Sequence, residues 1–119
     1  MLLDAPCTGL GALRRRPEVR WRRTADDVPP LVELQTALLE SALASVRVGG
    51  VVAYVTCSPH TAETVGVVDA AAGRDDVEVL PVPPLFPEVP DMARGDHGQL
   101  WPHRHGTDAM FMALLRRSR

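Results

Sequence analysis

Apolar residues in this chain gather in short continuous runs that are separated by longer amphipathic stretches. A continuous run of β-branched and apolar residues is typical of a strand that is buried inside a sheet. Such runs predict four short strands, at residues 1–3, 51–56, 77–80 and 109–115. We expect the first of these strands to be buried and the second, which is rich in valine, to be covered on both faces.

Two helices are predicted between these strands. The first runs from Leu31 to about Val46, where apolar residues recur at three- and four-residue steps and therefore share one face. That face comprises Leu31, Leu34, Leu38, Ala42 and Val46. A proline at its start and two glycines after its end fit the usual helix boundaries. The second helix is predicted from Ser58-Pro59 to about Ala72, because a serine cap followed by proline is a common helix start.

The alternation of strands and helices predicts an α/β fold with a parallel core. The last two strands have no helix between them, so we expect them to form an antiparallel edge hairpin. Residues 81–108 are rich in proline and are predicted to be an irregular loop, and residues 8–30 a long loop with some helix. The chain has 119 residues, of which 45% are hydrophobic, so residues 1–119 are expected to form one domain with its own core.

Charge, apolar run length and cysteine spacing argue against a membrane protein, a disulfide scaffold and a zinc site. The formal net charge is only −2 and no apolar run approaches the length of a membrane span, so the sequence predicts a soluble, cytoplasmic protein without membrane contact. The only two cysteines are fifty positions apart, which argues against a disulfide scaffold or a zinc ribbon. His97, His103 and His105 lack the spacing of a helix-borne zinc pair, so no metal site is expected.

Basic residues are distributed unevenly. All thirteen are arginines, and six of them fall within ten positions: Arg14, Arg15, Arg16, Arg20, Arg22 and Arg23. Such a cluster is found on nucleic-acid-binding surfaces and also on ordinary solvated faces. From the residues alone, the two interpretations have about equal weight.

The two cysteines each follow a predicted strand. Asp4 and Cys7 come after the first strand, and Cys57 comes directly after the second. Ligands of open α/β sheets bind beyond the carboxyl ends of the strands, and neighbouring strands lie about 4.8 Å apart. If these two strands are neighbours, both sulfur atoms can reach one flat ring. The alternative is that the cysteines are buried structural residues and that Asp4 caps a turn.

A pair of thiols suits the methylation of a pyrimidine ring. Carbon 5 of cytosine is a weak nucleophile until a thiolate adds at carbon 6, and the adduct must later lose the carbon 5 proton and expel the thiolate. Cys57 is the better nucleophile, because a helix starting near Ser58 would stabilise its thiolate. Hydrolysis by Cys57 and His60 is disfavoured, because residues so close on a turning chain seldom pair and no acid is placed to orient the histidine.

Five short motifs together carry a resemblance to a known family. They are Asp4-Ala5-Pro6-Cys7-Thr8-Gly9, Leu13-Arg14-Arg15-Arg16-Pro17, Trp21-Arg22-Arg23, Thr56-Cys57-Ser58 and Pro102-His103-Arg104-His105-Gly106-Thr107-Asp108. In this order they resemble the NOP/Sun family of RNA cytosine-5 methyltransferases, and in particular the bacterial 16S ribosomal RNA enzymes of Fmu/Sun type. The resemblance runs from residue 2 to about residue 115.

The resemblance implies a fold, an activity and roles for individual residues. The fold would be the C-terminal half of a Rossmann-like domain that uses S-adenosylmethionine to methylate cytosine carbon 5 in RNA, with ribosomal RNA favoured over transfer RNA. Cys57 would be the nucleophile and Cys7 the residue that aids release. Asp4 would contact the S-adenosylmethionine pocket, and the six clustered arginines would lie along RNA.

Two departures from the family pattern qualify these implications. The family's Pro-Glu-Glu-Asn run after the nucleophile is reduced here to Glu63. The family's glycine-rich donor loop and ribose-binding acid have no counterpart in this sequence, so we expect a partial catalytic domain with an incomplete donor site and no activity by itself. Strands missing from the sheet would leave an edge through which the chain could self-associate. The alternative function is a non-catalytic RNA-binding or interaction module derived from a methyltransferase.

Overall fold

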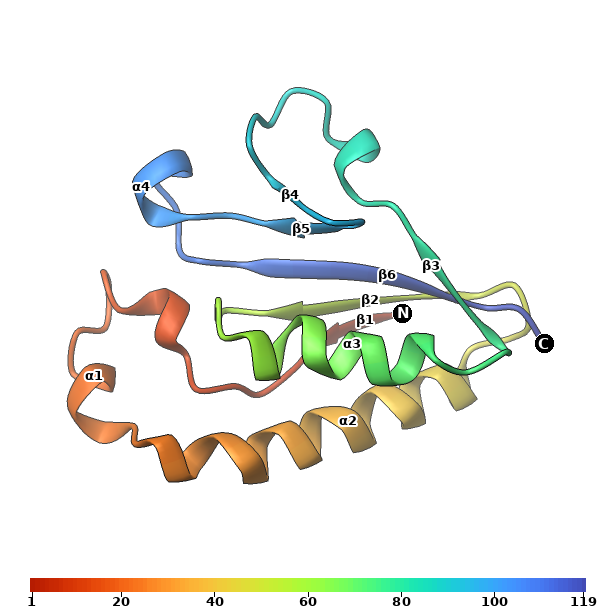
Figure 1. Ribbon diagram of the computed structural model, residues 1–119, viewed down its shortest axis with the longest axis horizontal. Helices are drawn as coiled ribbons and strands as arrows, with labels where there is room; N and C mark the ends of the chain where they lie inside the picture. The colour runs from red at the N-terminus through yellow and green to blue at the C-terminus, as the bar shows by residue number, and fades with distance from the viewer.

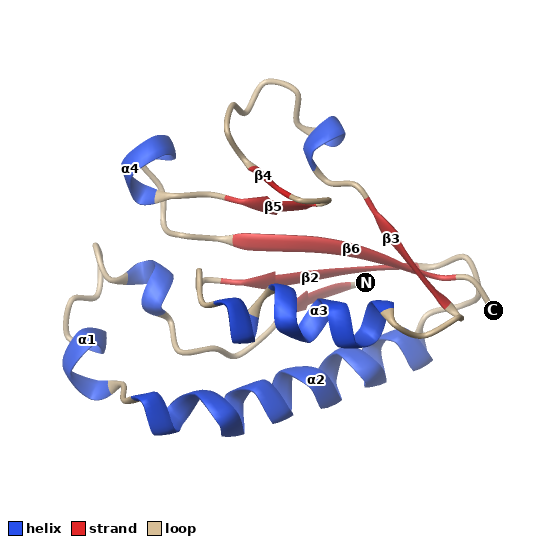
Figure 2. Cartoon of the chain, in the orientation of Figure 1, coloured by secondary structure: helices blue, strands red, loops and turns tan.

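The computed structural model describes residues 1–119 as one mixed sheet with its two longest helices packed on the same face (Figures 1 and 2). The strands are β1 (Leu2–Asp4), β2 (Val51–Thr56), β3 (Val77–Leu80), β4 (Ala93–Arg94), β5 (His97–Gln99) and β6 (Phe111–Arg117). The α-helices are α1 (Val19–Arg22), α2 (Val28–Ser45), α3 (Val65–Ala72) and α4 (Pro102–His105). Short 3₁₀ turns are η1 (Leu10–Ala12), η2 (Ala25–Asp27), η3 (Thr61–Glu63) and η4 (Pro83–Leu85).

The sheet has the order β1-β2-β6-β5-β4, and β3 also pairs with β6. β1 and β2 are parallel neighbours, and β6 runs antiparallel to β2, β3 and β5. The α/β fold and the antiparallel pairing of the last two predicted strands are therefore confirmed. The long strand β6 lies between β2 and β3, so it is the shorter β3 that lies at the margin of the sheet.

The proline-rich segment is more ordered than the sequence predicts. Residues 81–108 contain the β4–β5 hairpin, the turn η4 and the short helix α4. Gly95 turns the hairpin with φ 61°, a conformation that glycine adopts without strain. These elements are only two to four residues long, which is too short for a hydrophobic period to reveal them.

Helix α2 presents a different face to the core than its leucine spacing suggests. The buried residues are Gln35, Leu39, Ala42 and Leu43, whereas Leu34 of the predicted face is 45% exposed. On this buried face, Gln35 donates to the backbone oxygen of Pro6 at 2.8 Å. The face of α2 that is buried therefore combines Gln35 with Leu39, Ala42 and Leu43 of the hydrophobic core.

The first strand was predicted to be buried and the second to be covered on both faces, and neither prediction holds fully. β1 pairs only with β2, and its Leu2 side chain is 69% exposed, so this strand is not buried. In β2, Val52 and Tyr54 are fully buried under the helices, whereas Val51 and Val55 on the opposite face are only half-buried. One face of β2 is thus well covered and the other only in part.

None of the helices combines the length and the apolar character that a membrane-spanning helix needs.

Candidate active site

The two cysteines meet at the carboxyl ends of the parallel pair β1 and β2. Pairing of Asp4 with Val55 brings the ends of these strands side by side. The Sγ atoms of Cys7 and Cys57 lie 3.5 Å apart, and both residues are free thiols that are partly accessible. The structure therefore brings together the two thiols that the sequence places fifty residues apart.

A pocket of about 340 Å³ opens beside the two sulfur atoms. This volume is within the range of small-molecule sites. Its lining combines the two thiols with one carboxylate and three guanidinium groups, which come from Asp4, Arg15, Arg16 and Arg23. Reactive sulfur and charges of both signs therefore face the same space.

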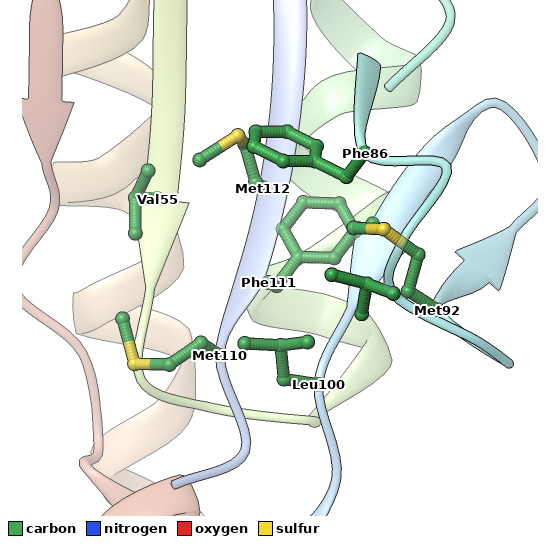
Figure 3. Close-up of a pocket in the computed structure, with 9 residues that line it drawn as sticks. Val55, Phe86, Met92, Leu100, Met110, Phe111 and Met112 are labelled. Carbon is green, nitrogen blue, oxygen red and sulfur yellow. The ribbon is translucent and has the colours of Figure 1, made fainter. Parts of the chain in front are cut away.

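A second cavity lies on the face of the sheet that α2 and α3 leave free (Figure 3). It measures about 290 Å³ and its lining is almost wholly apolar, with Phe86, Met110 and Met112 among its residues. It contains no thiol, no charged group and no residue that the sequence singles out. The pocket beside the cysteines is therefore the candidate active site.

The two thiols differ in protonation because they share a hydrogen bond. Either thiol could donate in the contact between the two sulfur atoms. With Cys7 as the donor, the hydrogen bond lowers the pKa of Cys57 to about 6, although burial and the carboxylates of Asp4 and Asp108 oppose the shift. The same hydrogen bond, together with burial, raises the pKa of Cys7 well above its usual range. These opposite shifts favour Cys57 over Cys7 as the thiolate of the pair.

The predicted helix start beside Cys57 is wrong. After Ser58 the chain makes the turn η3, and α3 begins only at Val65. No helix dipole is thus available next to Cys57. The hydrogen bond from Cys7 takes the place of the dipole as the main stabilisation of the thiolate.

Gly11 joins three segments of the site at one crossing point. Its N–H donates to the backbone oxygen of Cys57 at 2.9 Å, and its own carbonyl accepts from Ala109 at 2.8 Å. A Cβ atom at this position would lie 2.1 Å from the oxygen of Ala109 and 2.7 Å from that of Cys57. Only glycine therefore lets the Cys7 loop, the Cys57 loop and the start of β6 approach this closely.

The site can be compared with known proteins through its sequence. A family model described as 16S rRNA methyltransferase RsmB/F matches residues 1–116. The chain belongs to this family. A protein of Mycobacterium tuberculosis strain H37Rv named as a methyltransferase is 62% identical over 118 residues. The ribosomal RNA small subunit methyltransferase B of Thermus thermophilus is 41% identical over 117 residues.

Solved structures agree with this assignment. NSun6 from Pyrococcus horikoshii, crystallised with SFG, matches 99% of this chain with a TM-score of 0.82 and 30% identity. A methyltransferase homolog from the same organism matches 98% of the chain with a TM-score of 0.78 and 32% identity. The alignments cover only 26% of the mycobacterial relative, 29% of the Thermus enzyme, and 29% and 38% of the two crystallised chains. The chain thus spans about a quarter to little more than a third of these proteins.

In this family member, the six clustered arginines are not equivalent. Arg14 and Arg15 both bind the carboxylate of Asp108, and Arg15 does so through Nε at 2.9 Å and Nη2 at 2.6 Å. The Nε atom of Arg23 donates to the backbone oxygen of Thr8 at 3.2 Å. The Nε atom of Arg16 lies 3.7 Å from Oε1 of Glu18, with which it forms an ion pair.

Arg20 and Arg22, by contrast, make no ion pair and no side-chain hydrogen bond in the structure. Between them lies Trp21, whose side chain is 84% exposed. All six arginines are exposed, but four of them have partners within the chain and three of those line the pocket, whereas Arg20 and Arg22 have none and lie beside an exposed ring.

Two acidic residues of the site were not recognised from the sequence. Asp108 is held ionised by Arg15 and Arg14, which lower its pKa, and it fixes both guanidinium groups beside the pocket. Glu63 is fully buried between the two cysteine loops. Asp108 ends one of the motifs that carry the family resemblance, and Glu63 follows another, which is the only signal for them in the sequence. The residues that bind these two carboxylates are between five and 94 positions away in the sequence, so local pattern does not reveal them.

Proposed function

We propose that this chain carries the catalytic residues of an S-adenosylmethionine-dependent RNA methyltransferase that acts on cytosine carbon 5. The supporting observation is the pair of free cysteines with sulfur atoms 3.5 Å apart at the edge of a polar pocket, and the lowered pKa of Cys57 favours this residue as the nucleophile. Family membership favours RNA as the substrate, and the family description favours 16S ribosomal RNA over transfer RNA.

The first step uses the thiolate of Cys57. Its sulfur forms a bond to carbon 6 of the cytosine, and the electron pair of the carbon 5–carbon 6 double bond shifts so that carbon 5 becomes nucleophilic. A pKa of about 6 keeps most of Cys57 ionised at pH 7, so the nucleophile is present without a separate base. The methyl group that carbon 5 receives is supplied by S-adenosylmethionine when it is bound.

The second step uses Cys7, whose acidity depends on the state of Cys57. Once the sulfur of Cys57 is bonded to carbon 6, it no longer holds the charge that raises the pKa of Cys7. Cys7 can then lose its proton to water and take the carbon 5 proton as a general base. The carbon 6–sulfur bond breaks, the ring double bond returns, and Cys57 leaves as a thiolate. The pair ends in the protonation state in which it began.

The residues of this chain fit one wall of a donor site. Asp4, Ala5 and Pro6 line the pocket where β1 ends, and the Asp4 carboxylate is exposed and makes no ion pair. A carboxylate at this position can accept hydrogen bonds from the donor or from the amino group of the target base. The neighbour solved with SFG, an analogue of S-adenosylmethionine, supports this donor. The other walls would be supplied by parts of the longer relatives that this chain does not span.

RNA would approach the pocket along the arginine cluster. Arg20 and Arg22 have no internal partners and Trp21 is exposed, so this segment offers two free charges and one ring for stacking. Arg15, Arg16 and Arg23 line the pocket itself, where they face a target base that has left its stack. Self-association through the unpaired edge of β1 is a separate proposal, which sedimentation at increasing protein concentration would test.

Hydrogen exchange at cytosine carbon 5 tests the covalent step without a methyl donor. Addition of Cys57 lets carbon 5 accept a deuteron from D₂O, and reversal then leaves deuterium in the RNA. We expect exchange with the wild-type chain, none with Cys57→Ser and much slower exchange with Cys7→Ala. Met112→Leu, in the apolar cavity on the other face, should exchange like the wild type. Exchange that persists in Cys57→Ser would overturn the assigned nucleophile, and RNA binding without any exchange would favour the non-catalytic module.

A further inference from the structure

The side chain of Glu63 is a buried carboxylate between the two cysteine-bearing segments. It is 0% exposed and accepts four hydrogen bonds. Its Oε1 accepts from the backbone N–H of Thr8 at 2.8 Å and from the Gln35 side chain at 3.2 Å. Its Oε2 accepts from the hydroxyls of Thr8 and Ser58, both at 2.7 Å.

These donors adjoin the two thiols in sequence. Thr8 directly follows Cys7, and Ser58 directly follows Cys57. One carboxylate thus binds the residue after each cysteine, although the two loops are fifty positions apart. Besides the backbone bond from Gly11 to Cys57, a single side chain therefore connects the two loops at the residues next to the thiols.

We call Glu63 together with its partners Thr8 and Ser58 the clamp. The clamp is held by two further residues. Gln35 of α2 binds the carboxylate and also donates to the backbone oxygen of Pro6 at 2.8 Å, so both neighbours of Cys7 are held. The hydroxyl of Tyr54 in β2 donates to the backbone oxygen of Glu63 at 2.8 Å. The carboxylate is therefore anchored to the helix layer and to the sheet at once.

A buried charge is an expensive means of stabilising a fold. Desolvation of a carboxylate costs several kcal/mol unless hydrogen bonds compensate for it, and an apolar side chain of similar volume often serves stability equally well. Here the four donors outweigh burial and hold the pKa of Glu63 below its usual value. An apolar residue would fill the space, but it would remove the side-chain connection between Thr8 and Ser58 and leave only backbone contacts such as that of Gly11 between the loops.

We propose that Glu63 is a positioning residue, which acts through Thr8 and Ser58 to hold the Cys7 and Cys57 loops at the spacing that the two-thiol reaction needs. This inference rests on the proposed function for its biological meaning. Glu63 touches neither sulfur atom in the structure's contacts and takes no part in bond making. If Glu63 is changed, we therefore expect a change in the distance between the two thiols.

An arsenical probe shows whether the two thiols are close enough to be bridged, and it needs neither RNA nor a methyl donor. Phenylarsine oxide reacts with two adjacent thiols, forms two arsenic–sulfur bonds and releases one water, and it holds a lone thiol far more weakly. The wild-type chain should capture the probe with one arsenic per chain. Glu63→Gln keeps the size and one acceptor oxygen but turns an amide group toward the two hydroxyls, and we expect at least tenfold weaker capture. Thr8→Val removes one hydroxyl and should weaken capture less.

Two controls separate positioning from general stability. Thr8→Ser keeps both donors to Glu63 and should restore capture to the wild-type level. Leu39→Ala removes a core side chain of α2 that is 1% exposed, so it lowers the melting temperature without touching the clamp. Measured well below its melting temperature, Leu39→Ala should capture the probe like the wild type.

The outcomes distinguish this inference from the proposed function. Wild-type capture in both Glu63→Gln and Thr8→Val would overturn the positioning role, and so would equal losses in Leu39→Ala and Glu63→Gln at matched stability. Strong capture by the wild type without carbon 5 exchange would contradict the proposed reaction while leaving the clamp intact. If Glu63→Gln does not fold, the comparison of Thr8→Val with Thr8→Ser decides the question.

Discussion

Replacing Cys7 by alanine tests the hydrogen bond that activates Cys57. This bond is the largest cause of the lowered pKa of Cys57, and the remaining influences include burial and two carboxylates that act in the opposite direction. Without the donor, the pKa of Cys57 should therefore rise from about 6 to at least the ordinary thiol value of about 8.5. The pH at which Cys57 becomes reactive should move upward by the same amount.

The expected loss of thiolate is large at neutral pH. A thiol of pKa about 6 is roughly nine-tenths ionised at pH 7, whereas one of about 8.5 is ionised to only about 3%. The thiolate fraction therefore falls about 30-fold. The pKa also affects intrinsic nucleophilicity, which is lower for the more acidic thiol, so the fall in alkylation rate will be smaller than the fall in thiolate.

Iodoacetamide alkylation from pH 4.5 to 10 measures this change directly. Cys7→Ala leaves Cys57 as the only cysteine of the chain, so its rate is read without interference. In the wild type, mass spectrometry of the two cysteine peptides separates the sites. Cys7→Ser, which keeps a hydroxyl donor, should give an intermediate midpoint. A midpoint near pH 6 in Cys7→Ala would show that a group other than Cys7 stabilises the thiolate.

Three further predictions follow from other contacts of the site. Gly11→Ala should destabilise the fold by about 1–3 kcal/mol in urea denaturation, since its Cβ has no room, whereas Gly73→Ala, with its nearest contact at 3.6 Å, should be near neutral. Asp108→Asn removes a negative charge that raises the pKa of Cys57, so the alkylation midpoint should move to lower pH; an unchanged or higher midpoint would contradict this. Arg20→Ala and Arg22→Ala should each weaken RNA binding and reduce the slope of log affinity against log salt by about 1, and a slope equal to that of the wild type would exclude phosphate contacts.

The sequence was informative wherever a single segment carried the signal. The run before Cys57 and the apolar start before Cys7 predicted two strands, and the general rule for α/β sheets placed both thiols at one edge. The regular spacing of apolar residues located α2 to within three residues at its start. These features depend on local pattern, and the structure agrees with them.

Features that depend on contacts between distant segments were not predictable in this way. Gln35 is buried in α2 because it binds Pro6 and Glu63, which are distant in the sequence, and the lowered pKa of Cys57 follows from Cys7 and not from a helix end. The roles of Glu63 and Asp108 emerge only when their donors, distant in the sequence, are brought around them. A carboxylate in a sequence does not show whether it will be a solvated charge or the centre of a buried network.

Covalent trapping of RNA shows directly whether Cys57 bonds to the target base and Cys7 releases it. Because the chain spans about a quarter of the mycobacterial relative, it would be grafted into that relative in place of the matching segment and incubated with RNA and S-adenosylmethionine. With Cys7→Ala, we expect an SDS-stable protein–RNA adduct, mapped by mass spectrometry to Cys57 and absent when Cys57→Ser is added. Methyl transfer that continues in Cys57→Ser, or an adduct attached to any other residue, would exclude Cys57 as the nucleophile.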